Sequence, residues 1–135
     1  MGNIETVVAA IGKCELNEKD ATILNFEEIE GIPSGFIAQV IRFILPAFFP
    51  EEVCITSDID MLPLSKNYFV KEIEKYPADS ILILTSDAYG VDNKFPMCYI
   101  VAKGKYFKLL IGLNDVRKET INNFIIELYN KNEKN

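Results

Sequence analysis

The stretch Val53-Cys54-Ile55-Thr56-Ser57-Asp58-Ile59-Asp60 decides how this chain is expected to fold. Its first four residues are apolar or β-branched, which is typical of a short buried strand. Two aspartates, Asp58 and Asp60, follow directly, and Pro63 blocks any continuation of the strand. Open α/β sheets bind ligands beyond the carboxyl ends of their strands. The stretch therefore predicts a buried strand that leads into a ligand site.

The two carboxylates are expected to bind a divalent cation. In a continuing strand, side chains two residues apart project from the same face, so Asp58 and Asp60 would converge. Two nearby carboxylates repel each other, which favours a hard cation that neutralises them. Mn²⁺ or Mg²⁺ fits such oxygen ligands, with water or a substrate diphosphate completing the coordination. The alternative is that one aspartate caps a turn and the other is solvated.

Helices and strands alternate along the rest of the chain, which predicts a layered α/β domain. Apolar residues at i, i+3 and i+4 spacing predict a helix over 36–45, with Ser34 as its N-cap. Further helices are expected over 68–76 and 116–130, the latter capped by Asn114 or Asp115, and strands over 6–11, 21–26, 80–85 and 98–102. Residues 106–111 are apolar enough for a helix or a strand, and we favour a helix. The near-continuous apolarity of 80–85 indicates a sheet that is covered on both faces.

Composition limits the classes of function. The length of 135 residues suits one domain, expected over 1–129, with a polar disordered tail over 130–135. A net charge of −6 argues against a nucleic-acid partner, and the absence of histidine removes the usual general base and every histidine-based zinc site. Three dispersed cysteines indicate packed thiols in a reducing compartment. No membrane span or secretion signal is recognisable, so the expected location is cytoplasmic.

An ordered set of segments resembles the glycosyltransferases of the GT-A fold. In that family a helix of the form A-Q-x-x-R-x-x-x-P precedes a hydrophobic strand that ends in D-x-D. Residues 38–46 match the helix, residues 53–60 match the strand, and residues 96–104 resemble a segment that lines the sugar or acceptor pocket. The resemblance covers roughly 31–112. It implies a compact three-layer α/β/α sandwich, shortened because only residues 1–52 precede the D-x-D strand.

The resemblance also implies roles for individual residues. Asp60 would ligate the metal, and Asp58 would contact the metal or the sugar and ribose of the donor. Arg42 would steady the donor sugar or the D-x-D carboxylates, Gln39 is a weaker candidate for the same pocket, and Ser57 would reach the nucleotide. Without the resemblance, a single helical arginine reads as a solvated or ion-paired side chain.

The reaction implied is metal-dependent transfer of a sugar from a nucleotide-sugar donor to a carbohydrate or other hydroxyl acceptor. An inverting enzyme of this kind needs a carboxylate base near the acceptor hydroxyl, for which Asp87 is the candidate. The alternative for Ser86 and Asp87 is a turn. Tyr89 and Tyr99 are interpreted as packing residues, with sugar stacking as the alternative.

Two other functions compete with sugar transfer. One is a catalytically incomplete module of GT-A type that binds or interacts without turnover. The other is a phosphatase of the haloacid dehalogenase type with Asp58 as nucleophile, although Leu62 stands where that pattern has Thr or Val. A homodimer is a further hypothesis, because a partner would cover surfaces that the missing elements normally bury.

Overall fold

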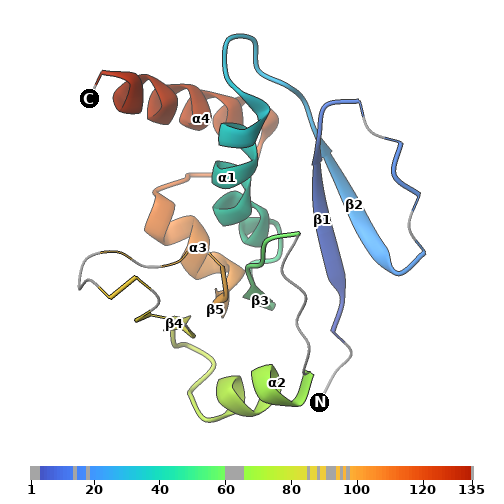
Figure 1. Ribbon diagram of the computed structural model, residues 1–135, viewed down its shortest axis with the longest axis vertical. Coiled ribbons are helices and arrows are strands. Elements are labelled where there is room, and N and C mark those ends of the chain that lie inside the picture. Colours follow the sequence, from blue (N-terminus) through green and yellow to red (C-terminus); the bar gives the residue numbers. More distant parts are fainter. Residues whose placement is uncertain are drawn as a thin grey trace.

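The computed structural model of the chain describes residues 4–13, 15–17, 19–59, 66–84, 86–87, 89–90, 94, 96 and 98–134. The elements are β1 (Thr6–Ile11), β2 (Ala21–Phe26), α1 (Ser34–Ile44), the 3₁₀ turn η1 (Leu45–Phe48), β3 (Val53–Ile55), α2 (Lys66–Glu74), β4 (Leu82–Ile83), β5 (Ile100–Lys103), α3 (Gly104–Ile111) and α4 (Lys118–Glu133). The strands form two small sheets (Figure 1). The mixed α/β class is therefore confirmed, whereas a three-layer sandwich around one sheet is not confirmed.

Helix α1 is the centre of the hydrophobic core. Its buried side chains recur at i, i+3, i+4 and i+7, the spacing of one helix face, and they are Ile37, Val40, Ile41 and Ile44. They pack with Leu113 and with Ile121 and Ile125 of α4. Figure 1 shows α1 between α3 and α4 on one side and the strands β1 and β2 on the other. Burial of each of these aliphatic side chains contributes about 1.5–3 kcal/mol.

The first sheet consists of β1 and β2, which lie parallel with Thr6 opposite Ala21 and Ile11 opposite Phe26. Both strands are confirmed where the sequence predicts them. Parallel neighbours usually need a crossover helix, but here residues 12–20 make the return. Ala9 and Ile11 pack against the core beside α1, which gives this short sheet one covered face.

The second sheet has the order β3-β5-β4, and both outer strands run antiparallel to β5. Burial is concentrated on the central strand, where Val101 and Ala102 are each 2% exposed. Val53 and Ile55 of β3 are 47% and 37% exposed, so the prediction of a buried strand before the acidic pair is wrong. The strand predicted over 80–85 shortens to Leu82–Ile83 and is not covered on both faces. Both strands lie at edges of the sheet, which explains their exposure.

The helix boundaries differ from the predictions at their caps. The N-cap of α1 is Pro33 rather than Ser34, which is the first helical residue. The segment 106–111 is a helix, the alternative that the sequence favours, and α3 begins two residues earlier at Gly104. The N-cap of α4 is Arg117, so the prediction of Asn114 or Asp115 at this position is wrong. The helix runs from Lys118 through Glu133, into the tail that the sequence predicts to be disordered. A Lys131–Glu127 ion pair of 2.8 Å supports this last turn. No helix in the described part of the chain combines the length and the apolar character that crossing a membrane requires.

A close backbone contact joins α3 to the segment after α1. A Cβ atom added at Gly104 would lie 2.0 Å from the carbonyl oxygen of Pro46 and 2.2 Å from that of Phe49. The amide of Gly104 donates to the carbonyl of Glu52 at 3.0 Å, and the amide of Lys105 donates to that of Pro50 at 3.0 Å. Only glycine fits here, because any side chain would push two backbone segments apart.

We predict that Gly104→Ala destabilises the protein by about 3 kcal/mol, because the methyl group would overlap backbone atoms that cannot move independently. Gly35→Ala is the matched control, since nothing lies within 4 Å of an added Cβ at this helical position. That substitution is expected to stabilise by about 0.5–1 kcal/mol. Urea unfolding followed by circular dichroism measures both changes, and equal stability of the two variants would contradict the contact.

Candidate functional site

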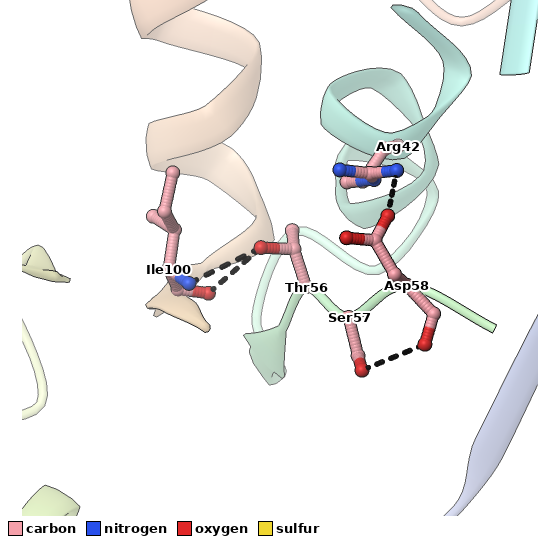
Figure 2. A network of polar contacts seen from close by, with 5 residues as sticks. All are labelled: Arg42, Thr56, Ser57, Asp58 and Ile100. Atoms are coloured by element: carbon pink, nitrogen blue, oxygen red, sulfur yellow. Dashed lines mark hydrogen bonds and ion pairs between the residues drawn. The ribbon is translucent and has the colours of Figure 1, made fainter. Parts of the chain in front are cut away.

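Two of the predicted site residues meet beyond the carboxyl end of β3. The carboxylate oxygen Oδ1 of Asp58 forms an ion pair with Nη2 of Arg42, which projects from α1 (Figure 2). The Arg42 side chain is 20% exposed and the Asp58 side chain 32%, so both charges are partly removed from solvent. An ion pair is stronger in such an environment than on an open surface, because solvent screens it less.

The position of Arg42 follows from the packing of α1. Arg42 comes directly after Ile41, which is 1% exposed, so the arginine lies at the border of the buried face. Its long stem can cover apolar surface while its guanidinium reaches the Asp58 carboxylate. Gln39, one turn earlier on α1, is exposed.

Ser57 lies on the opposite side of the chain from the ion pair. Figure 2 shows its side chain pointing away from Arg42, as expected for alternating residues of an extended segment. Its hydroxyl donates to the carbonyl of Asp58 at 3.1 Å, and the residue is exposed. The structure therefore brings Arg42 and Asp58 together and leaves Gln39 and Ser57 at the rim.

Sequence reasoning missed the role of Thr56. This residue is 4% exposed, and its hydroxyl lies 3.2 Å from the amide and 3.5 Å from the carbonyl oxygen of Ile100 on β5. The backbone amide of Thr56 also donates to the Ile100 carbonyl at 3.0 Å. Figure 2 shows the two contacts of the hydroxyl, and together with the backbone bond they join the end of β3 to the start of β5. The sequence feature that could have indicated this role is a hydroxyl side chain at the end of an otherwise apolar strand.

Tyr99 occupies the same end of the sheet in an unusual backbone conformation. Its φ is +59°, a left-handed value that costs a bulky residue conformational energy. Its amide donates to the carbonyl of Thr56 at 2.5 Å, and its own carbonyl accepts from the amide of Leu84 at 3.2 Å. Its ring packs on Phe69 of α2, with 4.9 Å between ring centroids. This supports the interpretation of Tyr99 as a packing residue.

Asp87 follows β4, and Asp58 follows β3, at the same end of the sheet. Because β3 and β4 are both antiparallel to β5, their carboxyl ends point in the same direction. One strand separates them, so the two exits are roughly 10 Å apart. Asp87 is exposed, and its carbonyl accepts from the amide of Gly90 at 3.0 Å, the hydrogen bond of a β-turn. The backbone thus follows the turn interpretation of this segment.

The described residues supply one carboxylate, Asp58, at the predicted metal site. No group of three or more potential metal ligands occurs within the described ranges, and Asp60 lies outside them, as do Leu62 and Met97. Asp115 is engaged elsewhere: it accepts from the amide and guanidinium of Arg117 at 3.0 and 3.1 Å. These hydrogen bonds lower the pKa of the Asp115 carboxyl and fix the start of α4.

An open hollow of about 460 Å³ lies at the end of β1, lined by Gly12, Lys13, Glu15 and Asn25. None of the predicted site residues lines it. We therefore place the candidate site at the end of the β3-β5-β4 sheet, where the ion pair and the Thr56 contacts converge.

No protein-family model, curated protein or solved structure matches the chain.

The thiol of Cys54 on β3 provides a local test of this packing. Burial, and then the nearby charge of Glu52, raise its pKa from 9.0 to about 11. Because only the thiolate reacts with alkylating reagents, the reactive fraction at pH 8 falls about a hundred-fold.

We therefore expect iodoacetamide to modify Cys54 about a hundred times more slowly in the folded protein than in urea. The rate of Cys54 modification in the folded protein should keep rising as the pH passes 9.0, the ordinary pKa of a thiol. Peptide mass spectrometry at several pH values measures the modification. Equal rates in the folded and the urea-unfolded chain would show that β3 does not shield the thiol.

Proposed function

We propose that this chain binds a nucleotide-diphosphate sugar together with Mn²⁺ or Mg²⁺ and transfers the sugar to a hydroxyl acceptor. The observation that carries the proposal is the ion pair between Arg42 of α1 and Asp58 after β3. The resemblance to GT-A glycosyltransferases implies this contact between the helix arginine and the first acid of D-x-D.

Arg42 is suited to the diphosphate of the donor. A guanidinium has five N–H donors in a planar fork that matches phosphate oxygens, and one of its nitrogens contacts Asp58. Asp58 holds the guanidinium in place and neutralises part of its charge until the donor arrives. The remaining carboxylate oxygen of Asp58 can accept a hydrogen bond from a sugar or ribose hydroxyl.

We propose that Asp58 and Asp60 would together hold a divalent ion at this site. Mg²⁺ is commonly held by one or two carboxylates plus substrate phosphates, and Asp58 with Asp60 would provide those carboxylates. When bound, the ion would offset the negative charge that develops on the leaving diphosphate. Asp87 remains the proposed base, because it follows β4, whose carboxyl end lies at the same end of the sheet as the carboxyl end of β3.

A second candidate is a module of GT-A type that binds a donor or partner without turnover. The observation that favours it concerns the end of β3, where the described residues have one carboxylate, Asp58, in an ion pair with Arg42. They form no cluster of carboxylates there. Donor binding and product formation must therefore be measured separately.

We predict that Arg42→Lys and Asp58→Asn each weaken donor binding at least ten-fold, because each removes a charge-assisted hydrogen bond from the donor's surroundings. Isothermal titration calorimetry with UDP-glucose and GDP-mannose, each with Mn²⁺ and with EDTA, measures the affinity. Arg117→Lys and Asp115→Asn are matched controls, since this pair of an exposed arginine and a partly exposed aspartate has the same chemistry and belongs to the start of α4. These controls should bind as tightly as the unmodified protein.

We predict that Asp60→Ala abolishes the part of donor binding that depends on Mn²⁺, because it removes the expected second metal carboxylate. Chromatographic detection of released nucleoside diphosphate tests turnover in the same samples. Binding without release would support the non-catalytic module. If neither donor binds under any condition, the proposed function is wrong.

A further inference from the structure

We infer that Thr56 is a positioning residue whose hydroxyl holds a β-bulge that directs Asp58 toward Arg42. The inference rests on the proposed function where it concerns donor binding. Its structural part depends only on the hydrogen bonds at the end of the β3-β5-β4 sheet. Thr56 is the buried polar side chain of the described residues, and it lies two positions before Asp58.

The bulge is visible in the pattern of backbone partners. In a regular antiparallel pair, Thr56 and Ile100 would exchange two N–H···O=C bonds. Here the amide of Thr56 donates to the Ile100 carbonyl, but the Thr56 carbonyl accepts from the amide of Tyr99 instead. Tyr99 and Ile100 therefore both oppose Thr56, which is the two-against-one arrangement of a β-bulge. The left-handed φ of Tyr99 belongs to this arrangement.

The Thr56 hydroxyl supplies the acceptor that the bulge takes away. The amide of Ile100, displaced from the Thr56 carbonyl, donates to the Thr56 hydroxyl oxygen at 3.2 Å. Without the hydroxyl, this partly buried amide would lose its acceptor, which costs more than a normal hydrogen bond contributes. The structure can restore an acceptor by returning the Thr56 carbonyl to Ile100 and releasing Tyr99.

Such a return would change the bend and twist of this end of the sheet, because a β-bulge bends the strand that carries it and increases the local twist. Figure 2 shows Thr56 and Asp58 on one side of the segment and Ser57 on the other. Fixing Thr56 therefore fixes the side from which the Asp58 carboxylate meets Arg42. Bulges commonly terminate pairing and re-aim side chains beside functional sites.

The decisive comparison is between Thr56→Val, which keeps the shape, and Thr56→Ser, which keeps the hydroxyl. The Nε–H signals of the two arginines, Arg42 and Arg117, report their ion pairs in a ¹H–¹⁵N spectrum, with Arg117 as the internal reference. Amide hydrogen exchange of Ile100 reports the lost acceptor. Thr22→Val is the matched control, because Thr22 is an exposed strand threonine of β2.

In Thr56→Val we expect exchange at Ile100 to accelerate roughly ten-fold or more and the Arg42 signal to move, while that of Arg117 stays in place. Thr56→Ser and Thr22→Val should retain the original Arg42 signal. An unchanged Arg42 signal in folded Thr56→Val overturns the inference. If Thr56→Val does not fold, Thr56→Ser decides: a retained Arg42 signal supports the inference and a lost one overturns it.

Titration of the same samples with UDP-glucose or GDP-mannose plus Mn²⁺ separates this inference from the proposed function. Weaker binding in Thr56→Val, restored in Thr56→Ser, supports both. If the Arg42 signal follows the hydroxyl but the unmodified protein binds neither donor, the positioning role stands and the proposed function fails. If the donors bind and Thr56→Val binds them as the unmodified protein does, the positioning role in donor binding is wrong.

Discussion

The packing of one face of α1 against α4 and β1 is the interaction on which the rest of the structure depends. Four aliphatic residues of α1 are buried there, and they set the rotation of the helix about its axis. That rotation places Arg42 at the border of the core, where its guanidinium meets Asp58. The position of a charged site group is thus determined by apolar contacts of the adjoining face of the same helix.

Elements with a clear local period could be predicted from the sequence, but their pairing could not. The strands at 6–11 and 21–26 and the helix near 36–45 follow from residue type and spacing. The exposure of Val53 and Ile55 does not, because an apolar run reads the same in a central strand as in an edge strand. The edge position of β3 is decided by its pairing with β5, and this pairing joins residues 46 or more positions apart in the sequence.

The candidate site was predictable to a similar extent. Asp58 was recognisable as an acid after a strand, and its partner Arg42 was implied by the resemblance to GT-A enzymes. The contribution of Thr56 was not predictable, because its hydroxyl replaces a backbone acceptor only once Tyr99 takes the left-handed conformation. No local sequence pattern predicts a tyrosine with a φ of +59°, because the intrinsic preferences of tyrosine disfavour this backbone conformation and only tertiary contacts maintain it.

The contact at Gly104 has a consequence for how this chain can change during evolution. Gly104 follows β5 directly, and Pro46 belongs to the turn that follows α1 directly. Main-chain atoms therefore fix the position of α1, which carries Arg42, relative to β5, which is hydrogen-bonded to Thr56. The spacing of these atoms does not depend on side-chain identity. Substitutions in the core can accumulate without moving one relative to the other. Insertions between α1 and η1 are a different matter, because they would separate the helix from the backbone contact at Gly104.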